Sequence, residues 1–125
     1  MKKFLYSFVT LFLAVTLSAC DHYNAPTSLR DTFYESYPSA VDVEWEKKRG
    51  YAVAEFTLPG EGECEAWYTK GGVWVMTKYD IKYSDLPQAV RTAFETSYGA
   101  QTPVDDVERL ERNTGEVIYF IEATV

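Results

Sequence analysis

The sequence is poor in the residues that build metal and redox centres. It holds one histidine, His22, and two cysteines, Cys20 and Cys64, among 125 residues. This set is too small for a zinc cluster of four Cys and His ligands. The sequence also contains no Ser-His-Asp motif, glycine-rich phosphate loop or dinucleotide fingerprint. We therefore predict no catalytic residue, no metal centre and no cofactor, and we expect a protein that is not an enzyme.

Basic residues are also scarce. There are 12 Lys and Arg against 19 Asp and Glu, a formal net charge of −7. A surface of this sign repels nucleic-acid phosphates and anionic lipid headgroups, so we expect no nucleic-acid partner. The rest of the composition is typical of one globular domain, since 46% of the residues are hydrophobic and 16% are aromatic.

Residues 1–19 have the pattern of an export signal. Lys2 and Lys3 precede a mostly apolar run over residues 4–17, which is too short to span a bilayer. The Leu-Ser-Ala-Cys that follows resembles a bacterial lipobox, which implies that Cys20 becomes the lipidated first residue of the mature chain. We expect a lipid-anchored envelope protein facing the periplasm, at either the inner or the outer membrane. A soluble exported protein with an accidental cysteine is the alternative.

Two stretches have the spacing of amphipathic helices. A short polar tether over residues 20–27 leads into the first helix, where Ser28 and Asp31 predict a capping box. The apolar face of this helix consists of Leu29, Phe33 and Tyr37. The second helix is bounded by Asp85 before it, Pro87 in its first turn and Gly99 at its end. Its apolar face includes Phe94, which is expected in the core like Phe33 of the first helix.

Elsewhere the apolar residues recur with a period of two, which is typical of strands with one solvated face. The predicted strands cover residues 41–46, 51–58, 61–69, 73–79, 104–112 and 116–125. Residues 47–50 are predicted to be a charged hairpin turn containing Lys47, Lys48 and Arg49. The sequence thus predicts an α+β fold, a tandem helix-plus-antiparallel-hairpin repeat with about six antiparallel strands and two helices packed on one face of the sheet.

The repeat is visible in the sequence itself. Residues 29–37 and 90–98 share Arg, Phe, Ser and Tyr in the same order, and each segment is followed by an Asp-Val-Glu. One domain over residues 28–125, built from two similar halves, is therefore expected. The halves are predicted at about 28–83 and 84–125.

Several of these segments resemble one family of exported proteins. The shared residues run through both helices and several strands, and they include Phe33, Tyr37, Pro38, Ala40, Val43, Trp45, Gly50, Tyr51, Trp67, Trp74, Leu86, Pro87, Phe94, Tyr119 and Glu122. Over roughly residues 29–122 the chain is similar to the PepSY-like family of Gram-negative envelope proteins, whose fold resembles that of the β-lactamase inhibitory proteins (BLIP). The resemblance implies a small binding module without established catalytic residues. Inhibition of a β-lactamase is not implied, because similarity of fold does not transfer function.

Aromatic side chains provide the candidate binding surface. The alternation around Trp67 places its side chain on the uncovered face of the sheet, beside Glu63 and Glu65. Trp74 points opposite to Tyr79 on the next strand, so one of these two sides also adds an aromatic residue to the open face. The candidate binding surface therefore comprises Trp67, Trp74, Tyr79, Glu63 and Glu65. Exposed aromatic patches mark binding surfaces. The alternative is that these aromatic side chains only cover one another.

The acidic strand faces allow other interpretations. Glu61, Glu63 and Glu65 share one face of a predicted strand, and clustered carboxylates can bind a divalent cation or carry out glycosidase chemistry. A solvated acidic face is the plainer alternative. Cys64 lies between two of these glutamates, whose charges raise a thiol pKa, and we expect it to be a small buried residue.

Together these patterns predict a lipid-anchored, noncatalytic binding module of the cell envelope. The expected partner is an envelope protein or peptide that binds to the open face of the sheet. Inhibition of that partner is one role that such binding can have. The alternatives are divalent-cation or small-ligand binding by the acidic strand faces, and an envelope hydrolase.

Overall fold

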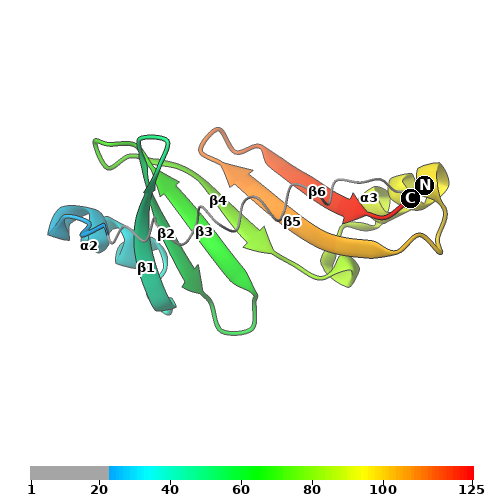
Figure 1. Ribbon diagram of the computed structural model, residues 1–125, viewed down its shortest axis with the longest axis horizontal. Helices are drawn as coiled ribbons and strands as arrows, with labels where there is room; N and C mark the ends of the chain where they lie inside the picture. The colour runs from blue at the N-terminus through cyan, green and yellow to red at the C-terminus, as the bar shows by residue number, and fades with distance from the viewer. Residues whose placement is uncertain (1–22) are drawn as a thin grey trace, which may run out of the picture.

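The computed structural model describes residues 23–125, which form one open antiparallel sheet of six strands. The strands follow one another in chain order, so that each pairs with its neighbours in the sequence (Figure 1). They are β1 (Val41–Lys48), β2 (Tyr51–Thr57), β3 (Glu63–Tyr68), β4 (Trp74–Asp80), β5 (Val104–Arg112) and β6 (Val117–Ala123). The export signal, Cys20 and His22 lie outside the described residues.

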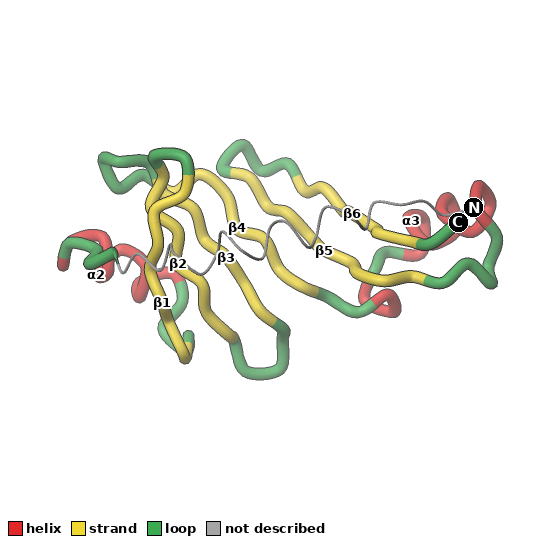
Figure 2. The backbone as a smooth tube through the Cα atoms, in the orientation of Figure 1, coloured by secondary structure: helices red, strands yellow, loops and turns green. Residues whose placement is uncertain are grey.

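Two α-helices accompany the sheet, α2 (Thr27–Ser36) and α3 (Gln88–Tyr98), and a short 3-10 helix, η1 (Tyr83–Asp85), precedes α3. The α-helices lie at opposite ends of the long axis of the molecule (Figure 2). The order helix, strand, strand occurs twice, and the predicted α+β fold with two helices and six antiparallel strands is confirmed. Within residues 23–125, no helix has the length and hydrophobicity needed to cross a membrane.

The hydrophobic core lies between α2 and one face of the sheet. The Phe33 ring is fully buried, with centroid distances of 4.9 Å to Phe56 and 5.6 Å to Trp45. The core residues of β2 and β3 alternate along each strand, as predicted, and comprise Ala52, Ala54, Phe56, Cys64, Ala66 and Tyr68. This alternation leaves the intervening side chains of both strands on the face opposite α2.

The C-terminal half also consists of a helix followed by antiparallel strands, but it has two strands where the N-terminal half has four, and it is packed differently. Helix α3 has no buried residue, so the prediction that Phe94 belongs to the core is wrong. The Phe94 ring is half-buried against Tyr83 and Tyr98, at centroid distances of 6.1 and 5.3 Å. All buried members of the main hydrophobic cluster lie between Ala25 and Tyr79. The deepest packing therefore belongs to the N-terminal half.

Both α-helices begin after a proline rather than at a capping side chain. Pro26 and Pro87 are the N-cap residues, with φ of −59° and −57°, and no side chain caps either helix. Proline holds φ near this value without help from a neighbour. The predicted capping box of Ser28 and Asp31 is therefore wrong, and Thr32 instead donates a hydrogen bond to the Ser28 carbonyl at 3.0 Å.

The first hairpin turns more tightly than the sequence pattern indicates. Strand β1 extends through Lys48, and only Arg49 and Gly50 form the turn, with φ of 53° and 87°. Two successive residues with positive φ are typical of a type I′ turn, which matches the twist of the paired strands. The predicted four-residue turn over 47–50 is corrected accordingly. Lys48 is a strand residue and not part of a hairpin tip.

A β-bulge in β4 reverses the expected alternation of its side chains. Met76 pairs with Trp67, whereas Trp74 already pairs with Tyr68, so Val75 has no counterpart on β3. An extra residue of this kind moves the side chains beyond it to the other face of the sheet. As a result Trp74 packs against the core cluster.

Candidate functional site

The sheet face opposite α2, called the open face from here on, carries a row of charged side chains. Glu44, Glu55, Glu65 and Lys78 stand side by side on β1 to β4, because each is in register with the next. Along β2 and β3 they alternate with the buried core residues, so they point away from α2. Register across four strands therefore brings together charges that are distant in the sequence.

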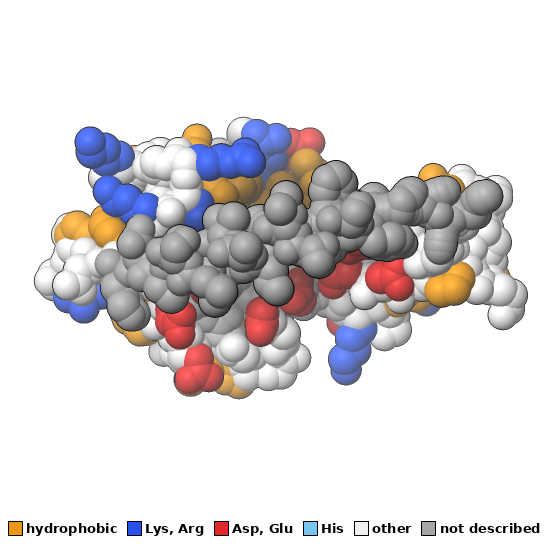
Figure 3. Space-filling model, viewed as in Figure 1, with side chains coloured by type: hydrophobic (Ala, Val, Ile, Leu, Met, Phe, Trp, Pro, Cys, Tyr) orange, Lys and Arg blue, Asp and Glu red, His pale blue; other side chains and the backbone are white. Residues whose placement is uncertain are grey.

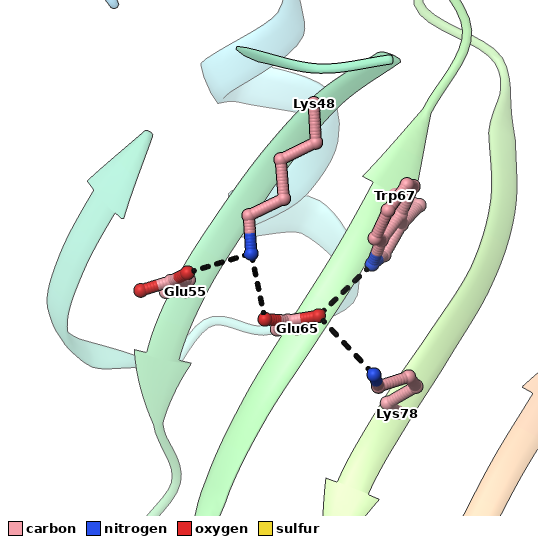
Figure 4. A network of polar contacts seen from close by, with 5 residues as sticks. All are labelled: Lys48, Glu55, Glu65, Trp67 and Lys78. Atoms are coloured by element: carbon pink, nitrogen blue, oxygen red, sulfur yellow. Dashed lines mark hydrogen bonds and ion pairs between the residues drawn. The ribbon is translucent and has the colours of Figure 1, made fainter. Parts of the chain in front are cut away.

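Glu65 is the centre of a polar network on the open face (Figure 4). Its Oε2 accepts a hydrogen bond from Lys48 Nζ at 3.1 Å, and its Oε1 accepts one from Trp67 Nε1 at 3.1 Å. Lys78 Nζ lies 3.7 Å from Oε1, and Lys48 Nζ also donates to Glu55 at 3.2 Å. Burial alone would raise the pKa of Glu65, but the hydrogen bonds and the two cations outweigh it and hold that pKa below its ordinary value. Glu65 is thus an ionised anchor for the indole.

Next to this network the open face is hollowed into a groove, here called the acidic groove. It is lined by Asp42, Glu44, Glu55, Phe56, Thr57, Glu63, Cys64, Glu65, Lys78, Asp80 and Glu108. Seven of these residues are acidic and one, Lys78, is basic. Acidic side chains gather along the lower part of the face seen in Figure 3, whereas most of the Lys and Arg side chains in view lie along its upper edge.

Three carboxyl groups crowd together at the β4–β5 end of the acidic groove. Asp80, Asp106 and Glu108 each place one carboxylate oxygen within 4.8 Å of the other two. Burial first, and then the charges of neighbouring acids, raise the pKa of Asp80 and of Glu108, with Lys78 opposing both shifts. Oxygen ligands suit a divalent cation. Exposed acidic groups are nevertheless common without one, and the cation site stays a prediction.

Replacing Asp106 with asparagine should stabilise the fold at neutral pH. When folding raises the pKa of a carboxyl group, the folded chain loses stability as the pH rises through that raised pKa. Asp80 and Glu108 are such groups, and the charge of Asp106 contributes to both shifts. We expect Asp106→Asn to raise the melting temperature by about 2 °C at pH 7. The gain should shrink towards pH 4, where the remaining carboxyl groups bind protons.

Glu35→Gln is the matched control for this stability measurement. It removes the same formal charge from an exposed position on α2, outside the acidic groove, and should leave the melting temperature unchanged at either pH. A gain from Asp106→Asn that is as large at pH 4 as at pH 7 would show that charge repulsion is not its cause.

The structure places three of the five predicted surface residues on the open face. Trp67, Glu63 and Glu65 lie there together on β3, and the Trp67 ring contacts the Tyr51 ring at a centroid distance of 5.7 Å. Trp67 is half-buried rather than fully exposed. Aromatic cover and the hydrogen bond to Glu65 together fix its position.

Trp74 and Tyr79 lie on the core side of the sheet, and the prediction that they extend the surface around Trp67 is wrong. Tyr79 is 7% exposed within the core cluster, and burial raises its pKa. Trp74 Nε1 donates a hydrogen bond to Thr77 Oγ1 at 2.8 Å, and the Tyr37 hydroxyl lies 2.8 Å from the same oxygen. These polar aromatic residues build the fold and not the open face.

The other acidic predictions are corrected in part. Strand β3 begins at Glu63, and Glu61 belongs to the preceding turn, where its N–H donates to the Leu58 carbonyl. Glu65 is not freely solvated, because two lysines and an indole bind it. Cys64 is buried, as predicted. Burial, with smaller contributions from Glu61 and Asp80, raises the pKa of its thiol to about 12, which leaves it unreactive.

Several charged residues of this site were not predicted from the sequence, among them Lys48, Glu55, Lys78, Asp80 and Glu108. They come from β1, β2, β4 and β5, and the alternation within one strand does not reveal its register with the next. A weak signal was present in β4, where charged residues 78 and 80 have the same spacing as Glu63 and Glu65 on β3. Comparison of such charged pairs on neighbouring strands would have indicated the groove.

Comparison with known proteins agrees with this fold. Residues 50–124 match the model of the PepSY-like family, which is described as beta-lactamase-inhibitor-like. A BLIP-like protein from Bacteroides fragilis is 32% identical, with a TM-score of 0.72 over 82% of this chain and 74% of that one. A DUF2874 family protein from Bacteroides ovatus is 30% identical, with a TM-score of 0.73 over 81% and 72% of the two chains.

A third solved structure, from Bacteroides eggerthii, has a provisional description as a periplasmic protein. It is 27% identical, with a TM-score of 0.75 over 82% of this chain and 74% of that one. No curated protein matches the chain.

Proposed function

Because this chain belongs to the PepSY-like family of beta-lactamase-inhibitor-like proteins, we propose that it is a noncatalytic envelope module that binds a protein or peptide on its open face. The BLIP-like name of one structural neighbour supports a protein partner, and the periplasmic description of another supports the compartment. The proposal includes a lipid anchor on Cys20. Ala25 is buried in the core cluster and α2 begins at Thr27, so the tether predicted over residues 20–27 is shorter than expected. With a lipid on Cys20, the domain would then lie within about 20 Å of the membrane.

The observation that carries this proposal is the preorganised state of Trp67. Its Nε1 donates to Glu65 at 3.1 Å, and Glu65 is itself held by Lys48 and Lys78. A side chain that is ordered before binding loses less entropy when the complex forms. Tryptophan is also among the residues that most often dominate binding energy at protein interfaces. Trp67 is therefore suited to be the central contact of a binding surface.

The chemistry of the described residues supports binding rather than catalysis. Residues 23–125 contain no histidine, and their single thiol, Cys64, is buried with a raised pKa. The most buried carboxylate of the network, Glu65, is neutralised by two lysines. Groups in this state neither attack a substrate nor exchange protons near neutral pH.

Trp67→Ala should reduce capture of the partner at least tenfold while the domain stays folded. Truncation of a central interface residue costs about 2 kcal/mol or more of binding free energy. The measurement is crosslinking in intact cells with the tagged full-length chain as bait, quantified by mass spectrometry. Thermal unfolding of each purified variant establishes that it is folded.

Tyr34→Ala is the matched control for capture. It removes an aromatic side chain that is 43% exposed on α2, away from the open face, and capture should stay at the level of the unsubstituted chain. Undiminished capture by Trp67→Ala, or equal losses in both variants, contradicts binding through the open face.

A further inference from the structure

The charges of the acidic groove are unevenly neutralised. Within residues 23–125, the ion pairs of Lys48 and Lys78 are made with Glu55 and Glu65 only. The other carboxylates of the groove have no cationic partner among the described residues, and they are Asp42, Glu44, Glu63, Asp80 and Glu108. The open face therefore presents an ordered, neutral centre beside an unpaired anionic strip.

This unpaired strip is costly in the free protein. Asp80, Asp106 and Glu108 lie within 4.8 Å of one another, and the raised pKa values of Asp80 and Glu108 reflect burial together with mutual repulsion. A cation placed among these groups would relieve the repulsion, whereas an anionic partner would increase it. Charge complementarity thus selects the kind of partner that the open face accepts.

The apolar part of the open face lies at a fixed offset from the strip. Trp67 has Val53 and Met76 as its neighbours in register on β2 and β4. Val53 is fully buried, so the accessible apolar surface here consists of Trp67 and Met76. Glu63 is four residues from Trp67 on the same strand, a separation of about 13 Å at the rise of a β-strand. The neutralised row around Glu65 lies between them.

Resting on the function proposed above, we propose that the open face binds a basic partner segment. Such a segment places an apolar residue on Trp67 and Lys or Arg side chains against Glu63, Asp80 and Glu108. In an extended segment the apolar residue and the first basic residue are about four positions apart, because an extended chain advances about 3.3 Å per residue. Lys48 and Lys78 stay with Glu65 and take no part in the contact.

The test uses two synthetic nine-residue peptides and the full-length chain. Both peptides carry one leucine at the first position and serine or threonine elsewhere, and they differ only in having three lysines or three glutamates at positions 5, 7 and 9. We expect the lysine peptide to bind at least tenfold more tightly than the glutamate peptide. Its affinity should fall at least tenfold between 50 and 500 mM NaCl, because the contact is ionic and exposed.

Two triple variants distinguish the effect of the groove's charges from the effect of the net charge of the chain. The variant Glu63→Gln, Asp80→Asn, Glu108→Gln should bind the lysine peptide at least tenfold more weakly. The control variant Asp31→Asn, Glu35→Gln, Glu116→Gln removes three acidic charges at exposed positions outside the groove and should bind within twofold of the unsubstituted chain. Both variants are checked by thermal unfolding before binding is measured.

Three outcomes overturn the proposal. Equal binding of the two peptides excludes charge selection, and equal weakening in both triple variants assigns it to net charge rather than to the groove. If millimolar Ca²⁺ binds to the groove and displaces the lysine peptide, the unpaired anionic strip is a site for a divalent cation and not for a basic segment.

Capture of the partner in intact cells distinguishes a failure of this proposal from a failure of the proposed function. If capture depends on Trp67 but is unchanged in the groove variant, the open face binds a partner and the basic segment is wrong. If capture is unchanged in both the Trp67→Ala and the groove variants, the proposed function itself fails.

Discussion

Replacing Phe33 with alanine is expected to lower the free energy of unfolding by about 3–5 kcal/mol. The Phe33 ring is fully buried and touches the rings of Tyr34, Tyr37, Trp45 and Phe56. Truncation removes these contacts and leaves a cavity that the surrounding sheet and helix cannot close. Such a loss is a large part of the whole stability of a domain of this size. Urea unfolding followed by tryptophan fluorescence measures it.

The sequence repeat supplies the control for Phe33. Phe94 has the corresponding position in α3, but that helix has no buried residue. Phe94→Ala should cost less than about 1.5 kcal/mol. Equal losses for the two substitutions would mean that the halves are packed alike, contrary to the structure.

Thr77→Val should destabilise the protein by about 2–3 kcal/mol although the two side chains have the same shape. Thr77 is fully buried, and its Oγ1 accepts a hydrogen bond from Trp74 Nε1 at 2.8 Å. The Tyr37 hydroxyl lies 2.8 Å from the same oxygen. Valine fills the space but leaves the half-buried Trp74 indole N–H without its acceptor. Urea unfolding at pH 7 gives the difference in free energy.

Thr77→Ser separates the hydroxyl from the methyl group of this side chain. Serine keeps the acceptor for Trp74 and loses one methyl, which is worth about 1 kcal/mol. If serine proves as costly as valine, the methyl packing and not the hydrogen bonds determines the stability at this position.

The fold was predictable because its signals are local. Alternation along β2 and β3 placed Ala54, Ala66 and Tyr68 in the core, and the structure confirms it. Glycine-containing turns separated the strands correctly, with small errors at their ends. The bulge at Val75 was not predictable from alternation, because it depends on how β4 pairs with β3, and the side of Trp74 was wrong for that reason.

The candidate site was predictable only where it lies on one strand. Glu63, Glu65 and Trp67 are alternate residues of β3, so their common face follows from the strand period. Lys48 and Lys78 reach Glu65 from β1 and β4. Their approach depends on sheet register, and hydrophobic periodicity carries no information about charged neighbours on other strands.

The uneven burial of the two helices has a consequence for local opening of the native state. All buried members of the main cluster lie between Ala25 and Tyr79, while α3 is attached through half-buried side chains. Segments with little buried apolar surface open at a small fraction of the global unfolding free energy. Amides of α3 would then exchange with solvent, and become sensitive to proteases, while β2 and β3 stay closed. The strand that carries Trp67 is thus kept rigid by the part of the molecule that opens last.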